Sequence, residues 1–150
     1  MSRKALKVIS NEPTKFIPKE YKDLDEKAKK MEDKPLIFWG KKLTRDQRYI
    51  FQEKMKLEYP DNYDPKDKDS VNQIEITGKG DAYKFIFDNC ITKIENVLLE
   101  TDPGKVEEIE VLEGDDKELY WNTEGDDVAI LSAINHYVET SSLDEAEEKN

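Results

Sequence analysis

The chain has 150 residues, of which 36% are hydrophobic and 39% are charged, so it fits one domain with a modest core. Residues 1–70 carry 18 basic and 14 acidic side chains (+4) and residues 71–150 carry 6 and 21 (−15), which together give the net charge of −11. The acidic half repels phosphate backbones, so nucleic acid is disfavoured as a partner. No apolar run reaches the roughly 20 residues that span a bilayer, and no signal peptide is recognisable. A single cysteine fits a reducing compartment.

The first 33 residues predict an extended N-terminal arm, because short apolar pairs alternate there with dense charge. Residues 23–31 have only a thin apolar face, formed by Leu24, Ala28 and Met31, which is compatible with one short helix. We expect residues 1–33 to dock on a partner. The alternative is that this segment packs on the core of its own domain.

A single globular domain is predicted over residues 34–140. Residues 35–39 are aromatic or apolar between a proline and a glycine, which favours a strand. Thr44 and Gln47 have the spacing of a capping box, and the helix that they start must end before Pro60. Residues 58–70 contain two prolines and alternating charge, which predicts a mobile linker. Weak alternation over 71–77 favours a second strand.

The strongest helical signal lies between Gly80 and Leu98. Its apolar residues fall on one stripe at spacings of three and four, and they are Tyr83, Phe87, Cys90, Ile91, Ile94, Val97 and Leu98. Residues 106–121 are interpreted as a hairpin with a loop at 113–116. A last amphipathic helix carries Ile130, Ile134 and Tyr137, and residues 141–150 form a charged C-terminal tail. The predicted fold is therefore α+β, with about three amphipathic helices and a small, mostly antiparallel sheet.

Residues suited to catalysis are few. Cys90 lies on the predicted apolar stripe and is expected to be a small buried side chain. His136 lies at the edge of the last helix and is expected to be half-exposed. One histidine and one cysteine cannot build a structural zinc site, and the acids of 61–69 lack the glycine and closing glutamate of a calcium loop. We predict no catalytic, metal-binding or cofactor-binding residue, and therefore a protein that is not an enzyme and needs no cofactor.

Binding features remain. Residues 100–127 hold 12 acids against two lysines, which predicts an acidic face with aromatic anchors. The partner-binding residues that we predict are Asp115, Asp116, Tyr120 and Trp121, together with Phe38 and Trp39. The alternatives are a solvated hairpin for the first four and a core strand for the last two. The basic front half can also attract the acidic half of a second copy, so a homo-oligomer is a further partner class.

Three short motifs carry a resemblance. They are the arm sequence Phe16-Ile17-Pro18-Lys19-Glu20-Tyr21-Lys22-Asp23, the strand Pro35-Leu36-Ile37-Phe38-Trp39 followed by Leu43-Thr44, and the ending Ser141-Ser142-Leu143-Asp144-Glu145-Ala146-Glu147-Glu148-Lys149-Asn150. In this order they resemble the tail assembly chaperones of long-tailed bacteriophages. The resemblance implies a protein of the host cell cytoplasm that binds the tape measure and tail tube proteins during virion assembly, without catalytic or cofactor residues.

An alternative comes from another class of protein. An acidic inhibitor could mimic nucleic acid with spaced carboxylates and block a host defence nuclease. The −15 half favours this hypothesis and the +4 half speaks against it. A continuous acidic ridge would indicate mimicry, whereas acids scattered among apolar residues would indicate chaperoning.

Overall fold

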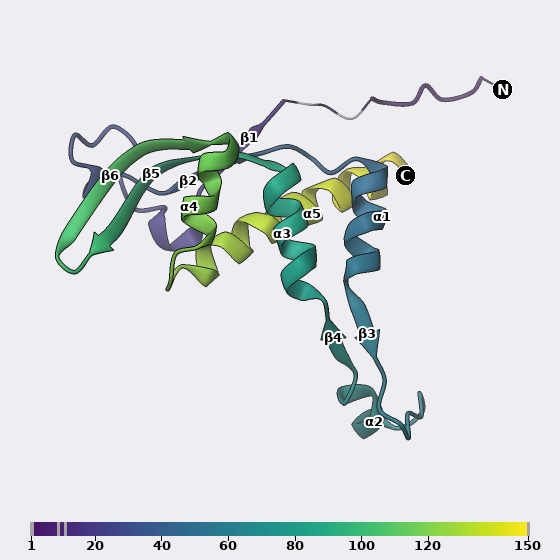
Figure 1. The fold of residues 1–150 in the computed structure, drawn as a ribbon. Helices are drawn as coiled ribbons and strands as arrows, with labels where there is room; N and C mark the ends of the chain where they lie inside the picture. Colours follow the sequence, from purple (N-terminus) through teal and green to yellow (C-terminus); the bar gives the residue numbers. More distant parts are fainter. Residues whose placement is uncertain (1, 9, 11, 150) are drawn as a thin grey trace.

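A computed structural model describes the backbone of residues 2–8, 10 and 12–149, and the side chains of these residues as far as Ser141. A four-stranded antiparallel sheet has the order β1-β2-β5-β6, and a separate two-stranded sheet pairs β3 with β4 (Figure 1). The strands are β1 (Thr14–Phe16), β2 (Ile37–Gly40), β3 (Lys56–Glu58), β4 (Glu75–Thr77), β5 (Ile91–Asp102) and β6 (Lys105–Glu113). The prediction of a mixed fold with a small antiparallel sheet is confirmed.

The described residues contain five α-helices, so the expectation of about three was wrong. They are α1 (Arg45–Lys54), α2 (Lys68–Asn72), α3 (Lys79–Asn89), α4 (Lys117–Trp121) and α5 (Asp127–Lys149). Three single turns of 3-10 helix are η1 (Lys19–Tyr21), η2 (Met31–Asp33) and η3 (Gly114–Asp116). The two unexpected helices, α2 and α4, have five residues each. A helix of that length is too short to display an apolar period in its sequence.

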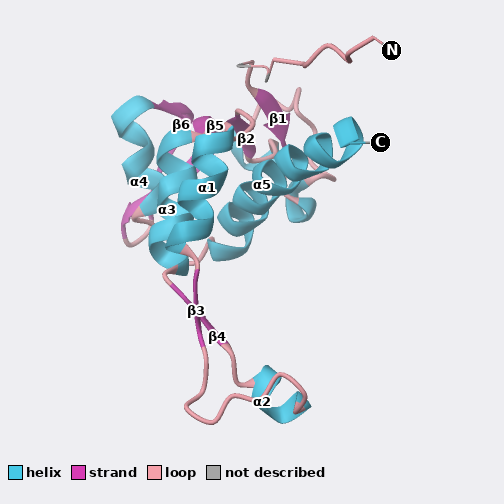
Figure 2. Ribbon diagram, turned by 90° about the vertical axis from the view of Figure 1, so that its right-hand side faces the viewer, coloured by secondary structure: helices cyan, strands magenta, loops and turns pink. Residues whose placement is uncertain are grey.

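The core lies between one face of the four-stranded sheet and helices α3 and α5 (Figure 2). Phe38, Ile94 and Leu112 are paired across β2, β5 and β6 and are all buried. Ile134 and Tyr137 of α5 are buried against them, as the apolar spacing of this helix predicted. Burial of each such side chain contributes about 1.5–3 kcal/mol.

The capping box at the start of α1 is confirmed. Thr44 Oγ1 accepts a hydrogen bond from the Gln47 backbone N–H at 3.2 Å, and Gln47 Oε1 accepts one from the Thr44 N–H at 2.9 Å. The helix ends at Lys54, earlier than expected, because the next residues form β3. The prediction of a linker over 58–70 was wrong in part, since α2 occupies residues 68–72.

The helix expected from Gly80 to Leu98 is instead two elements. Helix α3 ends at Asn89 and β5 begins at Ile91. Ile91, Ile94 and Val97 are all buried although they are three residues apart on a strand. A bulge opposite Gly40 inserts one residue between the first two, and Asn96 has a φ of +64° between the last two. Because of these two irregularities, the buried side chains of β5 recur every three residues, which in the sequence resembles the period of a helix.

The hairpin expected over 106–121 was also wrong. Strand β6 turns back on β5 through Pro103 and Gly104, and residues 114–121 are helical. The helical turn places Lys117 and Tyr120, which are three residues apart, on one buried face. The Lys117 ammonium donates to the carbonyl oxygens of Phe87 at 3.1 Å and of Ile91 at 2.5 Å, at the point where α3 changes into β5.

Much of the segment expected as an N-terminal arm is joined to the domain. Strand β1 pairs with β2, and the Tyr137 hydroxyl donates to the Thr14 carbonyl oxygen at 2.5 Å. Met31 and Ile37 are buried outside the main core, which indicates a small second cluster on the other face of the sheet. Residues 2–8 are extended and exposed. At the other end, α5 continues to Lys149, and buried Ser141 Oγ accepts from the Leu43 N–H at 2.9 Å.

Candidate protein-binding surfaces

Two of the predicted partner-binding residues are core side chains. Phe38 is fully buried and meets the Tyr120 ring edge to face, with ring centroids 5.5 Å apart. The Tyr120 hydroxyl donates to Asp126 Oδ2 at 2.5 Å. Burial, followed by the Asp126 carboxylate, raises the pKa of Tyr120 above its ordinary range. Their contacts stabilise the domain, and neither side chain is available to a partner.

The other four predicted residues do not share one surface. Trp39 and Trp121 are half-buried, and each ring lies under a lysine ammonium: Lys93 at 4.8 Å and Lys84 at 5.0 Å from the ring centroids. Trp39 follows core-facing Phe38 on a strand and therefore points to the opposite face of the sheet, whereas Trp121 packs on core residue Phe87. Asp115 and Asp116 are exposed in η3.

The two residues considered for catalysis are held in structural settings. Cys90 is buried, and burial raises the pKa of its thiol to about 12, so the thiol stays protonated at neutral pH. His136 stacks on Phe16 with ring centroids 4.5 Å apart, and burial lowers its pKa. Among the described residues, no group of three or more metal-ligating side chains is close enough to hold an ion. None of the described helices has the length and apolarity to cross a membrane.

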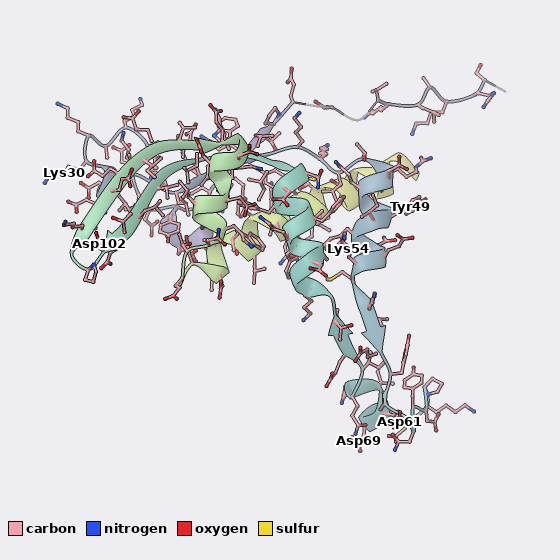
Figure 3. All side chains as sticks on the ribbon, viewed as in Figure 1. Lys30, Tyr49, Lys54, Asp61, Asp69 and Asp102 are labelled. Carbon is pink, nitrogen blue, oxygen red and sulfur yellow. The ribbon has the colours of Figure 1, made fainter. Side chains whose placement is uncertain are left out.

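Residues 56–77 form a projecting arm. It leaves the body between α1 and α3 as the β3–β4 ribbon and ends in a tip that contains α2 (Figures 1 and 2). Figure 3 places Asp61 and Asp69 at this tip and Lys54 near the base. None of residues 56–77 belongs to the main core. Within the arm, only Ser70 is buried, and its hydroxyl accepts from the Asp64 N–H at 2.7 Å.

Apolar side chains are exposed along the projecting arm. Leu57 and Ile76 are directly paired across the ribbon, yet they are 53% and 45% exposed. Tyr59 is 54% exposed and lies 4.8 Å from Tyr63 between ring centroids. Val71 of α2 is exposed as well. Folding of this segment costs conformational entropy, and burial of its own apolar side chains does not offset that cost. Exposed apolar side chains that lie together are typical of contact surfaces.

Acidic side chains are interleaved with these apolar ones. Glu58 and Glu75 are directly opposite on β3 and β4, and like charges in that position are destabilising. A shallow hollow beside them is lined by Glu58, Tyr59, Pro60, Asp61, Gln73 and Glu75. Three carboxylates beside an aromatic ring suit a lysine or arginine side chain from another molecule, through ion pairing and a cation–π contact.

The base of the projecting arm is closely packed. Gly78 is the N-cap of α3 and has a φ of +76°, and a Cβ built there would lie 2.0 Å from the Lys54 carbonyl oxygen. Only glycine tolerates both conditions. The two ends of the arm therefore meet the body where two segments of the chain pass close to each other.

A second exposed surface is the β5–β6 hairpin, which extends beyond the body (Figure 1). Strand β6 is the last of its sheet, and nearly all of its side chains are exposed. In the outer part, three successive cross-strand pairs combine an acid with an apolar residue: Leu98 with Glu108, Leu99 with Glu107 and Glu100 with Val106. The acids are thus interleaved with apolar side chains.

Comparison with protein-family models, with curated proteins and with solved structures gives no match. The likeness to phage tail proteins therefore stays a prediction that rests on the short motifs quoted above. Sequence reasoning missed the projecting arm because its strands have three residues each. One signal in the sequence could have predicted it: Leu57 and Ile76 lie on either side of the polar segment, as the apolar residues of two paired strands lie on either side of a long hairpin loop.

Proposed function

We propose that this protein is a non-enzymatic binding protein that holds a partner protein on its projecting arm. One observation carries the proposal: residues 56–77 form ordered structure that exposes the Leu57–Ile76 pair and Tyr59 instead of burying them. Partner side chains would bury these apolar groups. Aromatic and apolar residues of this kind supply most of the energy of protein interfaces.

The charge of the projecting arm indicates the chemistry of the partner. Glu58 and Glu75 are directly opposite in the ribbon, and the basic residue of the ribbon on their face is Lys56, two positions along β3. A basic side chain placed in the adjoining hollow would relieve their repulsion. The partner would therefore present apolar residues flanked by lysine or arginine.

We propose a phage tape measure or tail tube protein as this partner, on the basis of the sequence resemblance. Apolar side chains rimmed by acids suit an amphipathic helix with a basic flank. The nuclease-inhibitor alternative receives less support, because apolar residues such as Val106, Ile109 and Val111 are interspersed among the acids of β6.

Co-expression with tape measure and tail tube proteins tests the proposal. The full chain should retain one of them at low salt, and the double variant Leu57→Asp with Ile76→Asp should not. Val128→Asp is the matched control, because Val128 is 68% exposed on the body and an aspartate in the first turn of α5 is well tolerated.

The thermal melting curves of the two variants must match that of the wild type for this comparison to hold. Equal retention of the partner by the arm variant and the control would refute the arm as the contact surface. Retention of a defence nuclease in place of any tail protein would favour the inhibitor.

A further inference from the structure

The outer edge of β6 is open to another strand. β6 has nine residues (Lys105–Glu113) and pairs with β5 on one side only within the described residues. The strand carries Glu107, Glu108 and Glu110 in addition to exposed Val106 and Val111. Acidic side chains on an edge strand discourage pairing with copies of the same strand. They also favour pairing with a basic strand.

The chain itself supplies a segment of the opposite character. Residues 2–8 are extended, and Figure 1 shows them running away from the body. They contain Arg3, Lys4 and Lys7, while Leu6 and Val8 are 92% and 94% exposed. Seven extended residues span about 23 Å, which fits within the length of β6. Alternation along such a strand sets Lys7 on the face opposite to Leu6 and Val8.

We propose that residues 2–8 of one copy add as a fifth strand to the β6 edge of a second copy. Main-chain hydrogen bonds would close the open edge, and the basic side chains would pair with the glutamates. Leu6 and Val8 share one face of the added strand and would cover one of the two exposed valines, because Val106 and Val111 lie on opposite faces of β6. Residues 2–8 enter the sheet through β1, which lies at the edge opposite to β6. Their own β6 is therefore separated from them by the full width of the sheet, whereas a second copy can approach its edge directly.

This geometry allows two copies to exchange segments reciprocally. Each chain has one basic segment and one acidic edge. In a closed dimer, the segment of each copy therefore pairs with the edge of the other, and the same contact occurs twice. The proposal does not depend on the projecting arm, which uses other residues.

The mass of the full chain in solution tests the proposal, by light scattering during gel filtration at about 50 and 500 mM NaCl. At low salt the mass should be at least twice the 17.5 kDa of one chain, and it should fall to one chain at high salt because the contact is between opposite charges. Deletion of residues 2–8 should give a single chain at both salt concentrations. The arm variant Leu57→Asp with Ile76→Asp should assemble as the wild type does.

A charge exchange gives the sharper result. Arg3→Glu with Lys4→Glu and Lys7→Glu should abolish assembly, and so should Glu107→Lys with Glu108→Lys and Glu110→Lys. An equimolar mixture of these two variants should assemble, because each reversed segment then finds a reversed edge. Wild-type protein that is a single chain at low salt would overturn the proposal. Assembly that survives deletion of residues 2–8 would overturn it as well, even if the lysine variant of β6 fails to fold.

Discussion

Gly78 and Gly80 flank Lys79, and substitution of the two glycines by alanine should have opposite effects on stability. Gly78 has a positive φ and touches the Lys54 carbonyl oxygen, whereas a Cβ at Gly80 would meet nothing within 4 Å. Gly78→Ala should therefore lower the free energy of unfolding by about 1–3 kcal/mol through strain and the clash. Gly80→Ala should raise it by up to about 1 kcal/mol through helix propensity. Urea unfolding of both variants measures the two changes, and a neutral Gly78→Ala would contradict the tight crossing at the base of the arm.

His136 should couple stability to pH. Burial lowers its pKa, with Glu139 opposing and Lys22 reinforcing the shift, while Phe16 and Tyr137 pack against its ring. A lowered folded pKa means that protonation favours the unfolded chain. The contribution of His136 is therefore complete above its unfolded pKa of about 6.5 and is lost as pH falls through the folded value.

The free energy of unfolding of the wild type and of His136→Gln between pH 7.5 and 5.5 measures this contribution. The wild type should lose more stability over that interval than His136→Gln, because only the wild type has a histidine at this position to protonate. The carboxylates titrate at lower pH and are common to both proteins, so they do not contribute to the difference. Parallel pH profiles would show that the histidine has the same pKa in the folded and unfolded chains.

At the scale of an element, the boundary between α3 and β5 depends on Lys117. Its ammonium donates to the carbonyl oxygen of Phe87 in α3 and to that of Ile91 at the start of β5. Lys117→Met keeps the length of the side chain and removes the donor. The free energy of unfolding should fall by about 1–3 kcal/mol, the cost of leaving buried acceptors unsatisfied. Lys105→Met in the exposed hairpin turn is the control and should change it by less than about 0.5 kcal/mol. Equal effects of the two substitutions would contradict this role.

At the scale of the whole molecule, the projecting arm and the body should be thermodynamically separable. Lys54 and Gly78 are already adjacent, and residues 56–77 add nothing to the main core. Replacing these residues by a short Gly-Asn-Gly turn should change the melting temperature by less than about 4 °C, which corresponds to about 1 kcal/mol in a domain of this size. Differential scanning calorimetry of the full chain and the replaced chain tests this. A collapse of the transition would assign the arm a structural role.

The polarity of charge is also a property of the whole molecule. The half with a net charge of +4 includes the exposed basic residues 2–8, and the half with a net charge of −15 includes the acidic strand β6. Two surfaces of opposite charge on one chain favour contact between copies and steer basic partners toward the acidic half. Salt dependence is therefore the first property to measure for any complex of this protein.

Sequence reasoning succeeded where the signal was local. The capping box of Thr44 and Gln47, strand β2 and the apolar stripe of α5 each depend on residues within a few positions of one another. It failed at the α3–β5 boundary, because Ile91, Ile94 and Val97 kept the spacing of a helix. Of the six predicted contact residues, Phe38 and Tyr120 are core residues, since aromatic side chains suit an interface and a core equally well.

The mixed fold, the antiparallel sheet and the polarised charge could be predicted from the sequence, because they follow from composition and short-range periodicity. That β5 is a strand could not be predicted, because the contacts that favour it join residues distant in sequence. These contacts are the bulge opposite Gly40, the hydrogen bond from Asn96 Nδ2 to the Pro35 carbonyl oxygen at 2.8 Å and the Lys117 contacts. The tertiary structure likewise decided which apolar residues are left outside. Leu57 and Ile76 look like core residues in the sequence, but they lie on the projecting arm, beyond the crossing at Gly78, and are exposed.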